Sequence, residues 1–356
     1  MKTNFIKQHL WLIILLVGTG MNAWAEELDS SKKKEINQTF EVSTSDQLSI
    51  ENSYGNVTVT HWANNEVAIK VVVTASAGND SKAQEALDRV TVELSKTGKT
   101  VRGVTTIKNQ SGWLGNNGKL TIDYFISMPS KLAANISQKY GNINLPEKSE
   151  GKCNLEVKYG KINAGAFTEA LDIDAGYSDI TLKDVQNLAM DIAYCGNVKI
   201  GNGKNLSIDS KYSNVTMQNV DKISLDGKYG NLTVESADVV ALELKYGDVN
   251  IKRVKSDLSI AGFDYSNIKV GQLDAGFKKV NAEGRYGNLN LSIPSSAAFR
   301  VNAEQMKYGN VDLKGFKITN TNIENKVNYY YQINGGGNNT IQFNGNNYSN
   351  LKINAL

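Results

Sequence analysis

The stretch Lys228-Tyr229-Gly230-Asn231-Leu232-Thr233-Val234 is one copy of a motif that recurs twelve times along the 356-residue chain. Each copy begins with a tyrosine followed by a small residue. The next residue is most often Asn or Asp, and two apolar residues that flank a polar one complete the motif. Between Tyr140 and Tyr265 successive tyrosines are 17 to 19 residues apart, so the sequence predicts a protein built from one small repeat. The motif tyrosines are Tyr54, Tyr140, Tyr159, Tyr177, Tyr194, Tyr212, Tyr229, Tyr246, Tyr265, Tyr286, Tyr308 and Tyr348.

Each repeat contains two short segments in which apolar and polar residues alternate, which is the period of a β-strand. One segment precedes the tyrosine, with apolar residues such as Leu242 and Leu244, and the other follows it, with residues such as Leu232 and Val234. The parity of the alternation changes across the Gly-Asn pair of the motif. Because Gly and Asn both tolerate left-handed backbone angles, we expect the chain to turn a corner at these two residues.

Two folds are compatible with this pattern. A Gly-Asn pair between alternating strands is also a hairpin signal, which would give an antiparallel meander. In a parallel β-solenoid (β-helix) each repeat is one coil, and equivalent residues of successive coils stack about 4.8 Å apart. Only stacking gives a reason to keep Tyr over Tyr and Asn over Asn, so we predict an all-β fold with a solenoid of 17–19-residue coils. The predicted ladder contains Tyr140, Tyr159, Tyr177, Tyr194, Tyr212, Tyr229, Tyr246, Tyr265, Tyr286 and Tyr308.

The N-terminus has the form of a signal peptide, residues 1–25. Lys2 and Lys7 precede the apolar run Leu10–Val17, and Ala23-Trp24-Ala25 matches a cleavage site. The alternative is an uncleaved anchor helix, but the apolar run is shorter than the roughly 18–20 residues that span a bilayer. No later segment is long and apolar enough to cross a membrane as a helix. We therefore expect an exported monomer in the periplasm, at the cell surface or in the extracellular space.

The two ends of the mature chain differ from its middle. One helix is expected at Ser81–Arg89, with Ser81 and Gln84 as a capping box. The ends of a solenoid need covering because open strand edges promote aggregation. The predicted parts after the signal peptide are an N-terminal β-rich cap at 26–130, the solenoid repeats at 131–313, and C-terminal capping strands with the last repeat at 314–356.

Composition excludes several classes of function. The chain has 39 Lys+Arg and 36 Asp+Glu, a formal net charge of +3, which does not indicate a nucleic-acid-binding protein. After signal cleavage only one histidine, His61, and two cysteines, Cys153 and Cys195, remain. A zinc site built mainly from His and Cys, or a catalytic triad with a histidine at another position, is therefore excluded. No nucleotide-binding, metalloprotease or hydrolase motif is present, and we expect no cofactor and no enzymatic activity.

One row of charges stands out in six consecutive repeats. Three residues before each tyrosine the chain has an acidic residue, and one residue before it usually has a lysine. We expect an ion-pair lattice that keeps this face soluble, each pair contributing about 0–1 kcal/mol. Asp174 and Asp191 lack the lysine, since Gly176 and Ala193 stand in its place, and they form a candidate weak cation site. The acidic residues of the row are Glu156, Asp174, Asp191, Asp209, Asp226 and Glu243.

A few isolated residues allow further predictions. Trp113 is a possible contact for a sugar, although an aromatic packed on its own loop is the simpler interpretation. His61 has no second histidine as a partner and is interpreted as a strand-surface residue. Cys153 and Cys195 lie two coils apart, beyond the roughly 7 Å that a disulfide allows, and are expected to be unbonded. If the tyrosine rings are buried, truncating Tyr229 to alanine should cost about 3–5 kcal/mol.

The sequence resembles the bacterial "putative adhesin" β-strand-repeat family, a domain of unknown function. The resemblance covers most of the mature chain and rests on the stretch from Ile50 to Val57 followed by Trp62, on Lys82–Asp88, on the Lys-Tyr-Gly-Asn units, and on Asn347–Ile353. It implies an exported protein of Gram-negative bacteria with a β-solenoid body, and it carries no catalytic residues.

We expect a non-enzymatic, adhesin-like or structural protein of the cell envelope or surface, whose partner is an envelope protein or a glycan. The alternatives are a polysaccharide-acting enzyme on a parallel β-helix and a sensor domain for envelope stress.

Overall fold

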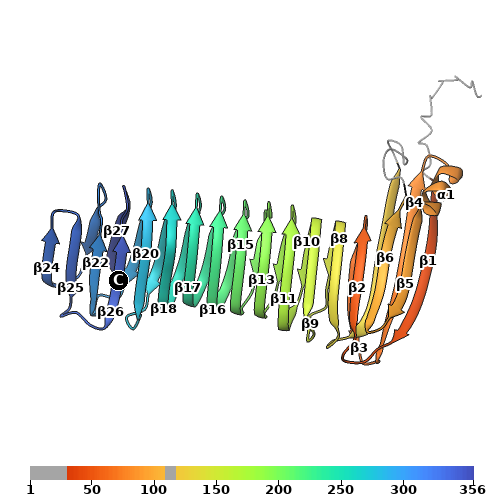
Figure 1. Cartoon of the computed structure of the whole chain (residues 1–356), viewed down its shortest axis with the longest axis horizontal. Coiled ribbons are helices and arrows are strands. Elements are labelled where there is room, and N and C mark those ends of the chain that lie inside the picture. Colours follow the sequence, from red (N-terminus) through yellow and green to blue (C-terminus); the bar gives the residue numbers. More distant parts are fainter. Residues whose placement is uncertain (1–29, 109–117) are drawn as a thin grey trace, which may run out of the picture.

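The two alternating segments of each repeat form strands of two sheets that enclose a common apolar core. The computed structural model describes residues 30–108 and 118–356, which form a long all-β rod with one helix (Figure 1). We call the sheet whose strands end at the motif tyrosines the pre-tyrosine sheet, and the sheet whose strands follow them the post-tyrosine sheet. The predicted signal peptide and Trp113 lie outside the described residues.

The pre-tyrosine sheet runs the whole length of the rod. Its repeat strands pair in parallel and in register, while β5, β24 and β25 at its ends pair antiparallel. In spatial order its strands are β5 (Val90–Thr97), β6 (Thr100–Ile107), β2 (Gln47–Ser53), β8 (Ala133–Asn144), β10 (Cys153–Ala164), β11 (Ala166–Gly176), β13 (Val185–Ala193), β15 (Gly203–Lys211), β16 (Val215–Lys228), β17 (Leu232–Lys245), β18 (Asp248–Asp264), β20 (Lys279–Arg285), β26 (Asn339–Asn344), β22 (Phe299–Glu304), β25 (Asn328–Ile333) and β24 (Ile318–Glu324).

The post-tyrosine sheet follows the same order of repeats. Segments of β8, β10, β16, β17 and β18 also belong to it, because these long strands continue past a corner of the coil. Its other strands are β1 (Ser30–Glu41), β4 (Glu66–Ala77), β7 (Lys119–Pro129), β3 (Val57–Trp62), β12 (Asp179–Leu182), β14 (Val198–Ile200), β19 (Asn267–Leu273), β21 (Asn288–Ile293), β27 (Asn350–Ala355) and β23 (Val311–Lys314), and the short β9 (Lys148–Ser149) pairs with the start of β11.

Parallel pairing between consecutive repeats makes the body solenoid-like and excludes the antiparallel meander there. Leu225 of one repeat, for example, lies directly beside Leu242 of the next, and both side chains are buried. Stacking of like residues gives one continuous core of Leu, Ile and Val along the rod, because every second residue of each strand points inward.

The corner of each coil differs from the sequence prediction. The left-handed backbone angle falls on the tyrosine, with φ of 58° at Tyr229, and the following Gly230 does not share it. Glycine is favoured there for a different reason. A Cβ built on Gly230 would lie 2.0 Å from the carbonyl oxygen of Ser213 in the preceding coil, so the close approach of two backbones leaves little room for a side chain.

Serine replaces glycine at this position in several coils. Ser213 is buried, and its hydroxyl accepts a hydrogen bond from the Cys195 backbone N–H at 2.9 Å and donates one to the Lys211 carbonyl at 2.8 Å. Ser178 makes the same pair of bonds with Gly160 and Gly176. A small side chain is thus accepted where its oxygen satisfies neighbouring backbone groups.

The N-terminal unit is an insertion between the first and second repeats. β2 pairs in parallel with β8, and the ring of Tyr54 stacks on that of Tyr140. The first coil therefore begins inside the region that we predicted to be a separate cap. β4, α1 (Asp80–Asp88), β5, β6 and β7 are inserted between these two coils, and β1 adds a further antiparallel strand on the outer side of β4.

Helix α1 covers the core at this end with Ala83, Ala86 and Leu87, the three residues expected on its buried face. Its N-cap is Asn79, whose side chain accepts a hydrogen bond from the Lys82 backbone N–H, and not the expected Ser81. The helix begins one residue early because Asn79 is itself a strong capping residue.

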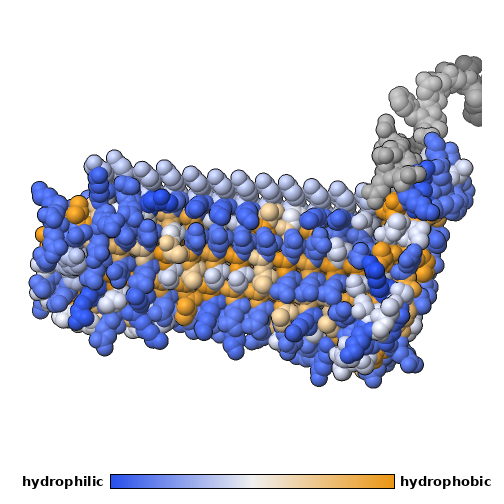
Figure 2. All heavy atoms as spheres, in the orientation of Figure 1, coloured by the Kyte–Doolittle hydropathy of each residue, from blue (hydrophilic) through white to orange (hydrophobic). Residues whose placement is uncertain are grey.

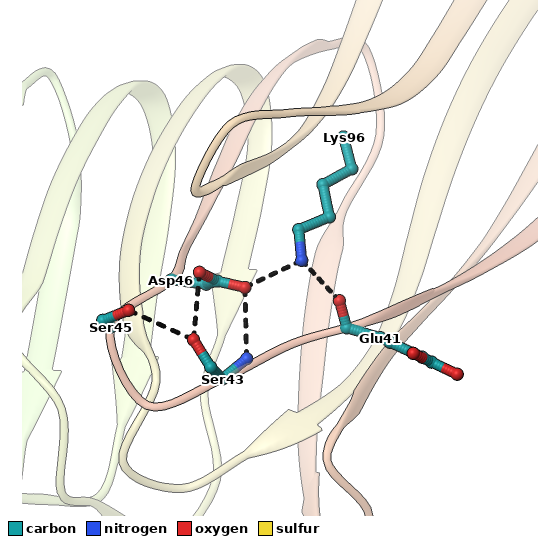
Figure 3. A network of polar contacts seen from close by, with 5 residues as sticks. All are labelled: Glu41, Ser43, Ser45, Asp46 and Lys96. Carbon is teal, nitrogen blue, oxygen red and sulfur yellow. Dashed lines mark hydrogen bonds and ion pairs between the residues drawn. The ribbon is translucent and has the colours of Figure 1, made fainter.

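A polar network joins the two sheets at the N-terminal end (Figure 3). The buried carboxylate of Asp46 accepts hydrogen bonds from the backbone and hydroxyl of Ser43, both at 3.1 Å, and from Lys96 Nζ at 2.8 Å. Lys96, on β5, also donates to the carbonyl of Glu41 at the end of β1. These bonds, led by that from Lys96, lower the pKa of Asp46.

The C-terminal end also departs from chain order. β26 and β27 lie between β20–β21 and β22–β23, so the last repeat of the sequence is not the last coil of the rod. The turn Asn334-Gly335-Gly336, in which all three φ angles are positive, brings the chain back from β25 to β26. The end of the rod is instead formed by β23 and by the hairpin β24–β25, at the blue end of Figure 1.

Candidate functional site

A long shallow groove lies on the outer face of the pre-tyrosine sheet. It has a volume of about 860 Å³ and crosses six strands, β2, β8, β10, β11, β13 and β15. A second depression of about 460 Å³ continues it across β16 and β17. Figure 2 shows this face, where a band of apolar colour appears between bands of hydrophilic side chains.

The floor of the groove consists of small polar or apolar side chains. The register of the parallel strands aligns one such residue from each coil, because equivalent positions of the repeat are direct partners. The amide of Asn154 lies within hydrogen-bonding distance of both of its neighbours in this row, Asn135 and Asp172. Because most of these side chains are short, they rise little above the backbone of the sheet, and the face is concave along this row. The floor residues are Ser49, Asn135, Asn154, Asp172, Ala189 and Ser207.

The acidic row predicted from the sequence forms the rim of this groove with four of its six residues, Glu156, Asp174, Asp191 and Asp209, and continues past the groove lining with Asp226 and Glu243. Glu156, Asp174, Asp191, Asp209, Asp226 and Glu243 are direct register partners on successive strands. Three ion pairs of the predicted lattice are present: Lys158 with Glu156 at 3.4 Å, Lys211 with Asp209 at 3.4 Å, and Lys228 with Asp226 at 3.9 Å. All these side chains are more than a third exposed, so each pair contributes little, about 0–1 kcal/mol.

Three carboxylates in the middle of the groove are different. Asp174 and Asp191 lie side by side beside the gap in the lysine row, as expected, and Asp172 lies two residues before Asp174 on the floor. Within the described part of the chain none of the three is in an ion pair. Sequence reasoning missed Asp172, although its outward parity in β11 was the available signal.

The cation site predicted at Asp174 and Asp191 remains a prediction. No group of three or more His, Cys, Asp or Glu side chains in the described ranges is arranged to hold a metal ion. His61 lies on β3, where its Nδ1 is 2.9 Å from the Lys148 carbonyl, and burial lowers the pKa of its half-buried ring. Cys153 and Cys195 are both buried and free, and burial raises the pKa of Cys153 to about 12.

The motif tyrosines form a continuous ladder along one edge of the rod. Successive ring centroids are 4.8–5.6 Å apart, and no pair of rings is tilted by more than 17°. Tyr348 stands between Tyr286 and Tyr308, so the expected direct contact of those two rings does not occur. In Figure 2 the ladder is the regular pale ridge at the edge where the pre-tyrosine strands end.

The rings are not buried. The loss of about 3–5 kcal/mol of stability expected for Tyr229→Ala was conditional on buried rings, so it does not apply. From Tyr140 onwards each motif tyrosine is 44–65% exposed, because the left-handed backbone angle turns its side chain out of the core. Every inner ring has a neighbour on both faces, so the ladder presents ring edges and hydroxyl groups to solvent. Between its two end rings, Tyr54 and Tyr308, the ladder therefore offers no open aromatic face on which a sugar could stack.

The asparagines of the motif form a second ladder beside the tyrosines. Asn231 accepts a hydrogen bond at Oδ1 from the backbone of Asp248, and the Asp248 carboxylate accepts from the side chain of Asn267. Asn288 donates in turn to Asn267 at 2.7 Å. These bonds satisfy backbone groups at the corner of each coil and give the recurrence of Asn or Asp in the motif a physical cause.

Among the described residues, no helix is both long enough and apolar enough to cross a membrane. Three solved structures are similar to the chain over most of its length. One is described as a "putative cell adhesion protein" from Clostridium sporogenes, with 16% identity, 90% of this chain and 100% of that chain covered, and a TM-score of 0.21. Another is a "putative adhesin" from Bacteroides fragilis, with 11% identity, 90% and 97% covered, and a TM-score of 0.25. The third is a "putative lipid binding protein" from Parabacteroides distasonis, with 12% identity, 89% and 96% covered, and a TM-score of 0.33.

No curated protein matches the chain significantly. Comparison with protein families gives a match over residues 45–347, from the turn before β2 to the turn before the last motif tyrosine. That range contains eleven of the twelve motif tyrosines and the whole groove. The match agrees with the resemblance recognised in the sequence, and the chain belongs to the Toastrack DUF4097 family, a domain of unknown function in bacterial proteins.

Proposed function

We propose that this is an exported, non-enzymatic binding protein of the bacterial envelope, which holds an extended partner in the groove of the pre-tyrosine sheet. We also infer that its body is a β-helix whose N-terminal end is capped by the inserted unit with α1. The export proposal rests on the signal-like residues 1–25.

The observation that carries the binding proposal is the charge of the groove. Six carboxylates line it, those of Glu51, Glu156, Asp172, Asp174, Asp191 and Asp209, against one lysine, Lys139. Lysines or an arginine pair with Glu51, Glu156 and Asp209, which leaves Asp172, Asp174 and Asp191 as the negative centre. An open groove of this length fits an extended chain, and its charge favours a partner with Lys or Arg side chains.

We therefore propose a basic, extended segment of another envelope protein as the partner. A neutral glycan is less favoured, because the inner rings of the ladder are stacked on both faces and the groove has an excess of negative charge. The regular spacing of the acids, one per coil, supports binding over catalysis, since a glycosidase needs two carboxyl groups set apart in distinct roles in a cleft.

The test uses a fluorescent peptide of alternating lysine and serine and, in parallel, a glycan array. We expect the peptide to bind, with an affinity that falls as salt is added. Combined Asp172→Asn, Asp174→Asn and Asp191→Asn changes should weaken binding at least tenfold, about 1.4 kcal/mol. A matched control removes three acids outside the groove lining, with Asp226→Asn, Glu235→Gln and Glu243→Gln, and should bind like the wild type.

Binding to glycans without binding to the peptide would contradict a basic protein partner and would show that the groove binds a glycan. Equal losses in the two triple variants would show that only the overall charge matters, and would contradict a specific site in the groove.

A further inference from the structure

The two ends of the rod are finished in different ways. At the N-terminal end α1 packs against β1, β4 and β5 and covers the core. At the C-terminal end the pre-tyrosine sheet extends two strands beyond β22, whereas the post-tyrosine sheet stops at β23. The hairpin β24–β25 therefore projects past the sheet that would otherwise face it, as the left end of Figure 1 shows.

The outermost strand of this end, β24, has an open edge. Within the described residues it pairs with β25 alone, and all seven of its side chains are exposed. Its sequence, Ile-Thr-Asn-Thr-Asn-Ile-Glu, contains no proline or glycine and a single charge, that of Glu324. The backbone groups on its free side are available to pair with another strand.

The inner side of the hairpin is apolar and incompletely covered. Register with β25 places Ile318 beside Ile333 and Ile323 beside Tyr329, on the side that faces the core in β22. Ile318 is 43% exposed and Ile323 is 49% exposed. Tyr329 and Tyr331 lie next to each other on β25 with ring centroids 6.4 Å apart, and both are only partly buried.

The edges at the other end of the rod are protected. β1 carries Lys32, Lys33 and Lys34 in succession, and β5 carries Glu93 and Lys96. Charged side chains on an edge strand are a common means of preventing pairing with another molecule. β24 carries only one charge, that of its last residue Glu324, so the difference between the ends points to a partner for this edge.

We propose that β24 pairs with β24 of a second copy of this chain, antiparallel and about a two-fold axis normal to the sheet. The charges at the ends of the strand select this arrangement. Lys317, directly before β24, comes close to Glu324 of the other copy, and the contact occurs twice. A parallel arrangement would instead place Lys317 near Lys317 and Glu324 near Glu324, which is unfavourable.

The two-fold axis also explains the apolar side chains. A rotation about an axis normal to the sheet keeps each face of the sheet on its own side. The inner faces of the two hairpins therefore join, and Ile318, Ile323 and Tyr331 of both copies form one apolar layer beneath a continuous sheet. Burial of these side chains adds a hydrophobic contribution to the backbone hydrogen bonds of the new strand pair. The contact is closed, so it yields a dimer and not a filament.

The proposal replaces the monomer expected from the sequence, and it is tested with the intact mature protein by light scattering and sedimentation equilibrium. We expect the mass of a dimer. Ile323→Lys, at a side chain that is 49% exposed in the single chain, should raise the dimer dissociation constant about tenfold or more. The matched control Thr97→Lys places the same charge on the exposed end of β5 and should leave the dimer unchanged.

Charge exchange tests the orientation. Lys317→Glu and Glu324→Lys should each weaken the dimer, and the double variant should restore it, since every opposite-charge contact is then re-formed with its sign reversed. Thr321→Cys near the two-fold axis should form an intermolecular disulfide on oxidation, and the buried Cys153 and Cys195 should not compete. Thermal melts and circular dichroism check that each variant is folded.

Three outcomes would overturn the proposal: a monomeric mass for the wild type, growth into filaments, or a dimer insensitive to Ile323→Lys. A double charge variant as weak as either single variant would contradict the antiparallel pairing. None of these results bears on the groove, because β24 lies outside it.

Discussion

The side chain of Asn52 donates a hydrogen bond from Nδ2 to Oε1 of Gln138 at 3.0 Å, in the core where the first two coils meet. Asn52 also donates to the carbonyl of Ile122 in the inserted unit, and Gln138 donates to the carbonyl of Gly55 at 2.9 Å. The hydroxyl of Thr105 donates to Asn52 Oδ1. The pair thus satisfies buried polar groups of the insertion and of both coils at once.

Replacing Gln138 with alanine should destabilise the protein by about 1–3 kcal/mol, because Asn52 and the carbonyl of Gly55 lose a buried partner. Urea unfolding measures the difference. The control Gln38→Ala removes an exposed amide of β1 and should change the free energy of unfolding by less than about 0.5 kcal/mol. Equal effects would show that the buried network contributes nothing of its own.

Gly141 tests the close approach of the backbones. A Cβ at this position would lie 1.6 Å from the carbonyl oxygen of Gly55, so Gly141→Ala should force the coils apart and cost about 1–3 kcal/mol. A Cβ on Gly262, in β18, would have no neighbouring atom within 4 Å, so Gly262→Ala should be nearly neutral or slightly stabilising. A comparable loss of stability in both variants would contradict the steric explanation.

The ladder should respond to substitution in an unusual order. Truncating Tyr229 removes two stacking contacts of a half-exposed ring, which we expect to cost about 1–3 kcal/mol. Because φ at this residue is 58°, glycine is unstrained there and alanine is not. Tyr229→Gly should therefore be less destabilising than Tyr229→Ala, by about 1 kcal/mol. Thermal melts of the two variants decide the matter, and the opposite order would refute the role of the left-handed angle.

Acid should weaken the junction between the sheets at Asp46. The pKa of this carboxyl is lowered in the folded state, chiefly by its hydrogen bond with Lys96, below its ordinary value of 3.8. Its contribution to stability is therefore fully present above that value and is lost as the pH falls through the lowered pKa. Asp46→Asn should reduce stability at pH 7 and make the difference in stability between neutral and acidic solution smaller than in the wild type. Urea unfolding at several pH values is the measurement, and an unchanged pH dependence would contradict the assignment.

Asp174 and Asp191 can be tested as a cation site apart from the peptide. Two carboxylates and water should bind Ca²⁺ weakly, on the order of millimolar. Calcium at about 10 mM should then raise the melting temperature slightly, through mass action on the folded state. Asp174→Asn with Asp191→Asn should abolish the rise, whereas Asp209→Asn with Asp226→Asn should retain it. If both double variants lose the rise in melting temperature equally, there is no cation site at Asp174 and Asp191, and the acidic row is only part of an ion-pair lattice.

The period of the tyrosine motif was sufficient to predict an all-β stack with a tyrosine ladder, the two strands of each repeat, and the outward acidic row. These features depend on alternation and on equal spacing, which are local properties that every copy of the motif repeats. The buried face of α1 was predictable for the same reason, since Ala83, Ala86 and Leu87 have helical spacing.

The order of the coils at the ends depended on tertiary structure alone. Tyr348 stacks between Tyr286 and Tyr308, and β2 pairs with β8 across a long insertion. Parallel strands need matching register but no connection in sequence, so the motif does not encode which coil lies beside which. The exposure of the rings and the presence of the groove could not be predicted from the sequence either. The exposure follows from the left-handed backbone angle at each tyrosine. The groove follows from small side chains aligned across six strands, which only the folded arrangement brings together.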